Sequence, residues 1–244
     1  MCEVCGCGDT RRVSIDVHAS LLEQNDRNAA HLRHHFEEDG VLALNLMGSP
    51  GSGKTALIEA TAKALAGRWQ LAAVSGDLAT ALDAERLQRV GVFALPITTG
   101  SACHLDASMV HHALHDDRLR HEVEVADVFF IENVGNLVCP AIYDLGQAAN
   151  VVVLSVTEGV DKPLKYPVMF HKADLVVLTK IDLLPHLPGV SLAELRANLA
   201  RVTPTAGVLE LSATTGSGVA GVVRWLETTR ESAHERSPLM QPEA

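Results

Sequence analysis

The sequence is poor in aromatic residues, which make up only 4% of its 244 positions. Its hydrophobic content of 47% is nevertheless ample for one core, so that core must be built from aliphatic side chains. Positive charge is also scarce, because 20 Lys and Arg face 30 Asp and Glu and leave a net charge of -10. Phosphate backbones repel such a chain, so the composition argues against a nucleic-acid-binding protein.

Long apolar runs are missing as well. No stretch of about 18 apolar residues is present to span a membrane, and residues 1–20 lack the apolar core of a signal peptide. We therefore expect a cytoplasmic protein without membrane partners. Cysteines number only five, and a cytosolic chain keeps them reduced. They are expected to be metal ligands, catalytic groups or buried thiols rather than disulfides.

From residue 40 onwards, continuous apolar runs alternate with helical patterns. Strands are predicted at 41–47, 71–75, 92–97, 127–131, 151–156, 174–179 and 207–211. Helices are predicted near 54–66, 83–90, 105–116, 163–172, 191–200 and 217–230. This alternation predicts an α/β fold with a mostly parallel sheet covered by helices on both faces. The expected divisions are a flexible cysteine-rich arm (1–12), a helical segment (13–39), the main domain (40–230) and a frayed tail (231–244).

A glycine-rich motif, "GSPGSGKT", follows the first predicted strand and precedes a predicted helix. It matches the phosphate-binding P-loop pattern in the required context. The glycines permit close backbone approach, the loop N–H groups cradle anions, Lys54 reaches the β- and γ-phosphates, and Thr55 offers its hydroxyl to Mg²⁺. The predicted nucleotide-binding residues of this loop are Gly48, Ser49, Pro50, Gly51, Ser52, Gly53, Lys54 and Thr55.

A second motif, "TKID", indicates guanine rather than adenine. It has Thr179 where GTPases usually carry Asn, followed by Lys180 and Asp182. An Asp carboxylate accepts from N1–H and N2–H₂ of guanine, and adenine offers neither donor there. Ser212 and Ala213 follow the last predicted strand and resemble the loop that contacts guanine O6. Taken alone, "TKID" is also a common helix-entry sequence.

Acidic residues after two other strands are candidates for the magnesium side of the site. Glu132 opens "ENVG", in which Gly135 is placed to offer its N–H to the γ-phosphate. Asp77 and Asp83 lie in "SGDLATALDAER", and one or both are expected to face Mg²⁺ or the attacking water. The alternative for either Asp is a helix cap. Lys54, Asp83 and Glu132 are the predicted catalytic residues.

The cysteines form two groups. Cys103 adjoins His104, and Cys139 comes seven residues after Glu132. If the two segments meet, they bring together a thiolate pair and an imidazole, a ligand set that suits Zn²⁺ or Ni²⁺. Ligands from a symmetry mate would put that site on a dimer interface.

The other group is Cys2, Cys5 and Cys7, which with the chain's N-terminus offer four donors that suit square-planar nickel. Tetrahedral zinc, a redox pair of Cys2 and Cys5, and exposed thiols without function remain as alternatives for it.

Two histidine pairs are spaced four residues apart, His31 with His35 and His111 with His115. Such spacing places both imidazoles on one helix face and permits weak metal binding. Charged neighbours favour solvated helix faces instead.

Together these strings resemble the family of hydrogenase nickel-incorporation GTPases, HypB. The resemblance rests on "CEVCGCG", "GSPGSGKT", "GDLATALDAER", "TGSACHLDA", "ENVGNLVCP", "EGVDKPLKYP" and "TKIDL", and it covers residues 1–7 and 40–220. It implies a dimerising P-loop GTPase that uses GTP, Mg²⁺, Ni²⁺ and Zn²⁺ and works with other hydrogenase accessory proteins. By position, Cys2, Cys5 and Cys7 match the family's N-terminal nickel site, and Cys103, His104 and Cys139 match its second metal site.

The resemblance implies a GTP-hydrolysing nickel metallochaperone for [NiFe]-hydrogenase, with GTP favouring a homodimer. Ser101 stands where the family usually has Lys. A urease-type accessory GTPase, a non-catalytic metal carrier with a regulatory nucleotide site, and a redox sensor are the alternatives.

Overall fold

The computed structural model describes residues 10–236, with side chains described from residue 20 to residue 235. Seven parallel strands form one sheet in the order β3-β2-β4-β1-β5-β6-β7. The strands are β1 (Leu42–Met47), β2 (Leu71–Asp77), β3 (Phe93–Thr98), β4 (Val128–Glu132), β5 (Ala149–Ser155), β6 (Leu175–Thr179) and β7 (Gly207–Glu210). The predicted α/β fold with a parallel sheet is confirmed.

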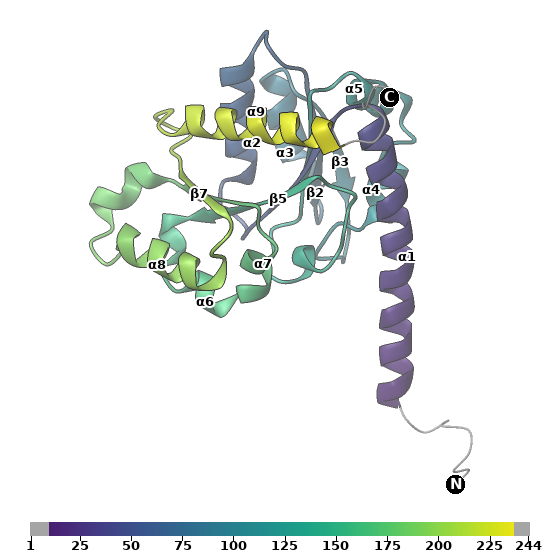
Figure 1. Cartoon of the computed structure of the whole chain (residues 1–244), viewed down its shortest axis with the longest axis horizontal. Helices are drawn as coiled ribbons and strands as arrows, with labels where there is room; N and C mark the ends of the chain where they lie inside the picture. The colour runs from purple at the N-terminus through teal and green to yellow at the C-terminus, as the bar shows by residue number, and fades with distance from the viewer. Residues whose placement is uncertain (1–9, 237–244) are drawn as a thin grey trace.

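Helices cover both faces of the sheet (Figure 1). The α-helices are α1 (Thr10–Glu38), α2 (Lys54–Leu65), α3 (Leu82–Arg89), α4 (Ala107–Ala113), α5 (Asp117–Glu124), α6 (Lys162–Lys165), α7 (Pro167–His171), α8 (Leu192–Val202) and α9 (Val219–Arg236). Three short 3₁₀ turns complete the list: η1 (Cys139–Ala141), η2 (Val156–Glu158) and η3 (Ile181–His186). Helix α5 was not predicted, and the helix expected at 163–172 is divided into α6 and α7.

The core is mostly aliphatic, with four buried phenylalanines, and the alternation of side chains along each strand divides it between the two faces of the sheet. Leu42, Leu44 and Leu46 of β1 point to one face, where they pack with α2, α3 and α9. On the other face, α1, α4 and α5 cover one half of the sheet, and α7 and α8 cover β5 and β6. Within residues 10–236, no helix is long and apolar enough to cross a membrane.

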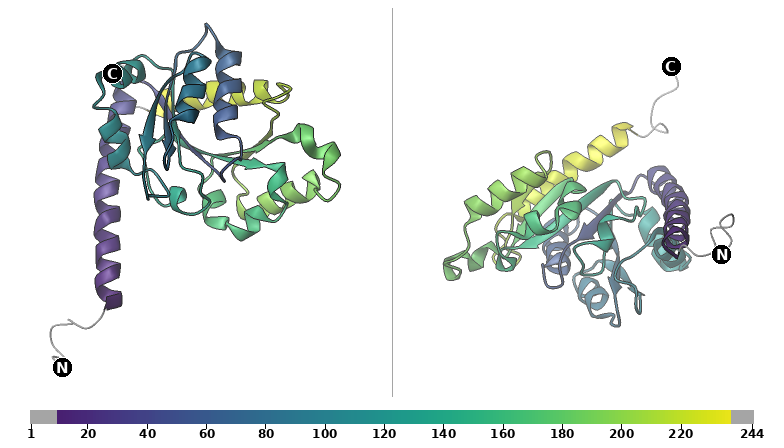
Figure 2. Two further views of the ribbon diagram at one scale, coloured as in Figure 1. Left: turned by 180° about the vertical axis from the view of Figure 1, so that it is seen from behind. Right: turned by 90° about the horizontal axis from the view of Figure 1, so that it is seen from below.

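Helix α1 packs on the body only through its C-terminal half, and the other half projects from the body (Figures 1 and 2). Asn25 is the first of its described side chains to be buried. Its amide Nδ2 donates to Asp144 O at 2.9 Å, and its Oδ1 accepts from Ala107 N at 2.9 Å. Arg33 adds two hydrogen bonds of 2.7 Å to the carboxylate of Asp144.

The ends of the described chain differ from the expected divisions. Helix α1 already begins at Thr10, inside the segment expected as an arm, and α9 continues to Arg236, inside the expected tail. Residues 1–9, which hold Cys2, Cys5 and Cys7, lie outside the described residues.

Candidate functional site

The phosphate loop joins the end of β1 to the start of α2 with three glycines at positive φ. A Cβ on Gly48 would lie 2.3 Å from the carbonyl oxygen of Val153, so only glycine fits beside β5. Gly53, the N-cap of α2, has φ of 101°. The loop therefore directs its backbone N–H groups and the N-terminus of α2 to one point, which is the arrangement that binds phosphate.

Lys54, Thr55 and Glu132 form a buried polar group at this point. Lys54 Nζ lies 3.4 Å from Gly48 O and 3.3 Å from Ser49 O. Thr55 Oγ1 donates to Glu132 Oε1 at 2.7 Å, and Ser75 Oγ lies 3.4 Å from Glu132 Oε2. Parallel pairing explains the meeting, because β4 lies between β1 and β2 and places Glu132 beside Leu46 and Ser75.

Burial dominates the titration of this group. Only 3% of Glu132 is exposed, and burial raises the pKa of its carboxyl to about 7 against the pull of Thr55 and Lys54. Burial likewise lowers the pKa of Lys54, although nearby carboxylates, Glu132 first among them, oppose the change. Both groups are thus poorly solvated. A bound polyphosphate would place negative charge beside Lys54, and its counter-cation would place positive charge beside Glu132.

Asp77 and Asp83 line the same cavity, which has a volume of about 390 Å³ and also contacts Lys54, Thr55 and Glu132. Asp77 accepts from Ala79 N at 3.1 Å and from Thr80 Oγ1 at 2.9 Å, and these bonds outweigh partial burial and lower its pKa. Its carboxylate thus holds the loop after β2.

Asp83 is not the cap of α3, because the N-cap is Ala81. It lies in the first turn, 3.3 Å from Arg86, and Arg86 also binds Glu59 at 2.8 Å.

The segment after β4 touches the phosphate loop. Asn136 N donates to Gly48 O at 3.1 Å. A Cβ on Gly135 would lie 2.8 Å from Cα and N of Pro50, so the two backbones approach as closely as glycine permits. The "ENVG" stretch therefore lies beside the loop, as its position after β4 predicts.

The residues expected to recognise the guanine base lie on the other side of the phosphate loop. Thr179 Oγ1 donates to Ser52 O at 2.5 Å, and Lys180 Nζ donates to Gly51 O at 2.7 Å. The hydroxyl of Thr179 is therefore bonded to the loop backbone rather than free for a base. Asp182 is half-buried in η3 and has no hydrogen-bond partner among the described side chains.

The last strand adds Ser212 and Ala213 to this side. Leu211 N donates to Leu178 O at 2.8 Å, which joins the end of β7 to that of β6. Ser212 is fully buried, and its Oγ accepts from Thr215 N at 3.2 Å. Ala213 packs against the core.

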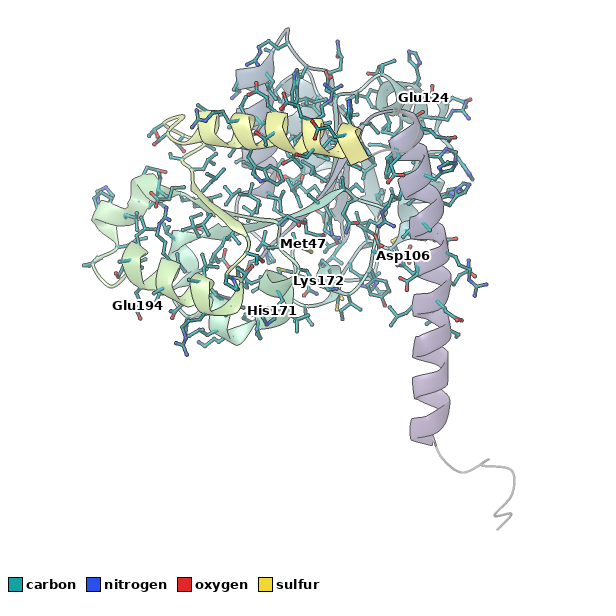
Figure 3. The ribbon with its side chains drawn as sticks, in the orientation of Figure 1. Met47, Asp106, Glu124, His171, Lys172 and Glu194 are labelled. Carbon is teal, nitrogen blue, oxygen red and sulfur yellow. The ribbon has the colours of Figure 1, made fainter. Side chains whose placement is uncertain are left out.

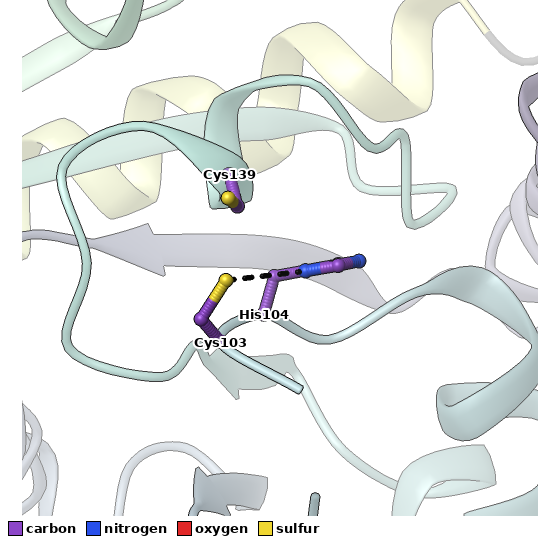
Figure 4. A group of neighbouring side chains, drawn as sticks. All are labelled: Cys103, His104 and Cys139. Carbon is purple, nitrogen blue, oxygen red and sulfur yellow. Dashed lines mark hydrogen bonds between the residues drawn. The ribbon is translucent and has the colours of Figure 1, made fainter. Parts of the chain in front are cut away.

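A second constellation consists of Cys103, His104 and Cys139, the metal triad (Figure 4). One ligand atom from each lies within 4.8 Å of the others, and both thiols are free. His104 stacks on Tyr143 with ring centroids 4.0 Å apart, and burial lowers the pKa of its imidazole. A hydrogen bond with the thiol of Cys103 raises the pKa of Cys139. A metal ion would therefore displace protons when it binds the thiols.

Asparagines connect the triad to the phosphate loop. Asn133 Oδ1 accepts from Leu105 N at 2.9 Å and so ties the Cys103 segment to the strand that ends at Glu132. Its Nδ2 donates to Asn45 Oδ1 at 3.2 Å inside β1. Asn136, bonded to Gly48, also accepts from Val138 N at 2.8 Å, next to Cys139.

Sequence reasoning missed several residues of this region. Asn133 and Asn136 lie inside a quoted motif, where polar residues directly after a buried strand were the available signal. Glu158, after β5, accepts a hydrogen bond from Ser49 Oγ. Arg86 is a cation on the wall of the cavity.

A family model described as the CobW/HypB/UreG nucleotide-binding domain matches residues 42–210. The hydrogenase maturation factor HypB of Rhizobium leguminosarum bv. viciae is 51% identical over 215 residues, covering 88% of this chain and 70% of the relative. That of Escherichia coli K12 is 43% identical over 223 residues, covering 91% of this chain and 75% of the relative. The chain belongs to the HypB family.

A HypB-family crystal structure, from Helicobacter pylori in complex with nickel, superposes with a TM-score of 0.81 at 38% identity. It covers 86% of this chain, and this chain covers 97% of it. The match to the HypB family confirms the resemblance inferred from the motifs, and with it the P-loop nucleotide-binding fold.

Proposed function

We propose that the chain is a GTP-hydrolysing nickel metallochaperone that delivers nickel during [NiFe]-hydrogenase maturation. The observation that carries the proposal is that one short segment serves two sites. It begins at Glu132 beside the phosphate loop, bonds Gly48 through Asn136 and ends at Cys139 in the metal triad. The similarity to HypB proteins that are named hydrogenase maturation factors supplies the biological setting.

The residues around the phosphate cavity support GTP hydrolysis. Water attacks the γ-phosphorus, the bond to the β–γ bridging oxygen breaks, and GDP and phosphate leave. Lys54, whose ammonium now lies against loop carbonyls, neutralises charge on the β- and γ-phosphates. Asp83 and Glu132 lie on the cavity wall, where a carboxylate orients the attacking water.

Mg²⁺ fits the oxygen donors that are already together. Thr55 Oγ1 and the Glu132 carboxylate are paired at 2.7 Å, and Mg²⁺ prefers such hard oxygen ligands. When bound there, the ion supplies Lewis-acid stabilisation of phosphate charge.

Guanine specificity rests on Asp182, whose carboxylate is unengaged among the described side chains. Thr179 supports the site indirectly, because its hydroxyl anchors the loop at Ser52.

Nickel is the cargo in this proposal. The metal triad offers two thiolates and one imidazole, a donor set that suits Ni²⁺ or Zn²⁺. Three protein ligands leave at least one position open for a transferring group. The arm with Cys2, Cys5 and Cys7, which lies outside the described residues, is the proposed second nickel site.

A homodimer favoured by GTP accounts for apolar side chains that surround both sites. Val138 and Ile142 flank Cys139 and are 47% and 49% exposed, and Leu78 and Leu82 beside the phosphate cavity are 47% and 61% exposed. Such a surface is suited to a second copy that approaches at the carboxyl edge of the sheet. Other hydrogenase accessory proteins and a cytosolic setting complete the proposal.

The test compares the full-length chain with three full-length variants under anaerobic conditions: Lys54→Ala, a triple Ser variant of Cys2, Cys5 and Cys7, and Cys103→Ser/Cys139→Ser. We expect GTP turnover above that of Lys54→Ala, and nickel bound at two separable sites by thiolate-to-nickel absorbance. Turnover no higher than that of Lys54→Ala refutes the enzyme. Equal nickel binding by the parent and the arm variant refutes the arm as a nickel site.

A further inference from the structure

Four imidazoles from two helices gather at the junction of α1 and α4, away from the cysteines. They are His31, His35, His111 and His115, and we call them the histidine cluster. Their ring centroids are 4.5 Å apart for His31 and His35, 5.5 Å for His31 and His111, and 4.8 Å for His111 and His115. The sequence showed two separate pairs, and the fold joins them into one group.

Helix packing fixes this meeting. His31 and His35 are one turn apart on α1, directly next to the buried Leu32 and Phe36. His111 lies in the last turn of α4 next to the buried Val110. These apolar neighbours belong to one core cluster, so the two helices cannot separate without exposing it.

Just past the end of α4, the turn that carries His115 is closed by a hydrogen bond of 3.1 Å from its N–H to His112 O.

The surroundings favour a bound cation. A cavity of about 290 Å³ beside the cluster is lined by His35, His111 and His115 together with the carboxylates of Asp39 and Glu124. Glu124 is labelled near the C-terminal end of α1 (Figure 3). Arg120, the cation on this wall, is already paired with Asp117 at 2.9 Å and with Glu124 at 3.7 Å.

The neutral form of His111 is favoured by its surroundings. Burial lowers the pKa of His111, and the imidazoles of His115, His31 and His35 lower it further. A neutral imidazole keeps a lone pair on one ring nitrogen, which is the form that binds metal. The lowered pKa of His111 therefore favours its metal-binding form.

The spacing also fits. With metal–nitrogen bonds of about 2.0–2.1 Å, the centroids of neighbouring ligating rings are separated by roughly 4.5–5.5 Å. The three distances in the cluster fall in this range. Among the described residues, only the metal triad already has three ligand atoms within 4.8 Å, so the imidazoles must rotate to direct their nitrogens to one ion.

We propose that the histidine cluster binds one divalent transition-metal ion of borderline softness, such as Zn²⁺ or Ni²⁺, and that this ion joins α1 to α4. Imidazole suits such ions. The site goes beyond the proposed function because it shares no ligand with the metal triad or the arm. Its consequence is an added, metal-dependent stabilisation of the α1–α4 contact that the shared core already makes.

The test uses the full-length chain and Zn²⁺, added beyond saturation of the thiol sites and followed by side-chain imidazole NMR and by bound-metal analysis. The cluster variant is His31→Ala/His111→Ala. The control is His121→Ala/His186→Ala, which removes two exposed histidines elsewhere. We expect the cluster signals to shift together with one additional ion, and the affinity for that ion to fall about tenfold or more in the cluster variant only, a change of about 1.4 kcal/mol.

Cluster signals that do not move, or additional binding equal in the two variants, would overturn the proposal. A cooperative urea-unfolding transition of the cluster variant like that of the parent shows that its fold is intact. If that variant does not fold, the NMR titration of the unmodified chain decides alone, because it reads each imidazole directly.

Discussion

Replacing Glu132 by Gln tests whether the buried carboxyl beside the phosphate loop controls how stability depends on pH. Gln has the same shape as protonated Glu, and its oxygen can accept from Thr55 as Oε1 does at 2.7 Å. The amide cannot ionise. The substitution therefore removes the titration while the packing and the principal hydrogen bond are kept.

The magnitude follows from the pKa, which is about 7 in the folded chain against an ordinary value of 4.5. At 1.36 kcal/mol per pH unit, that interval corresponds to about 3 kcal/mol of unfolding free energy. Because only 3% of Glu132 is exposed, solvent screening reduces this value little.

The sign follows from proton binding. Below pH 4.5, Glu132 is protonated in both states and its stabilising contribution is complete. As pH rises to about 7, the unfolded chain releases the proton while the folded chain retains it, so the unfolding free energy falls. The contribution is lost above that pH.

The assay is urea unfolding of both proteins from pH 4.5 to 8 without nucleotide and with a chelator. The two proteins differ only at residue 132, so the difference between the two unfolding free energies isolates Glu132. We expect the stability of the parent relative to Glu132→Gln to fall by about 3 kcal/mol across this range. A difference that stays constant with pH refutes the raised pKa.

Three further changes test the close approach at Gly135, the hydrogen bond of Asn133 and the role of Cys139 as a metal ligand. Gly135→Ala forces a Cβ to within 2.8 Å of Pro50, and we expect fluorescent-nucleotide titration to show binding weakened about tenfold, or 1.4 kcal/mol, relative to the unhindered control Gly189→Ala; equal affinities would contradict the close approach. Asn133→Ala leaves Leu105 N without its acceptor, so urea unfolding should show a loss of about 1–3 kcal/mol, and an unchanged midpoint would count against that bond. Cys139→Ser should remove one zinc ion per chain in bound-metal analysis, and an unchanged zinc content would exclude it as a ligand.

The strands could be predicted because they are mostly apolar runs in a parallel sheet, and β1, β4 and β6 are buried throughout. Helix α5 was missed because its eight residues, DRLRHEVE, bury only Leu119 and Val123 and look like a polar loop. The division of α6 from α7 lies at Tyr166, the residue before Pro167, where proline disfavours helical backbone.

The site was predictable where chemistry follows a strand end and not where it depends on tertiary contact. Glu132 ends β4, and Lys54 and Thr55 directly follow the phosphate loop after β1, which pairs with β4, so their meeting could be expected. The hydrogen bond of Thr179 to Ser52 joins residues 127 positions apart. No periodicity in the sequence encodes this hydrogen bond or the contact between His31 and His111.

The length of the projecting half of α1 determines two properties of its N-terminal end, the distance from the body and the direction in which it faces. From Asn25, its first buried described side chain, back to Thr10 is about 22 Å of helix at 1.5 Å per residue. Each residue inserted there would move the preceding chain outward by about 1.5 Å and turn it by about 100°. Seven inserted residues, nearly two turns, would extend the helix by about 10 Å and face its end almost the same way, while two would turn it through about 200°. The length of α1 therefore sets both how far from the body the helix begins and in which direction the chain leaves it at Thr10.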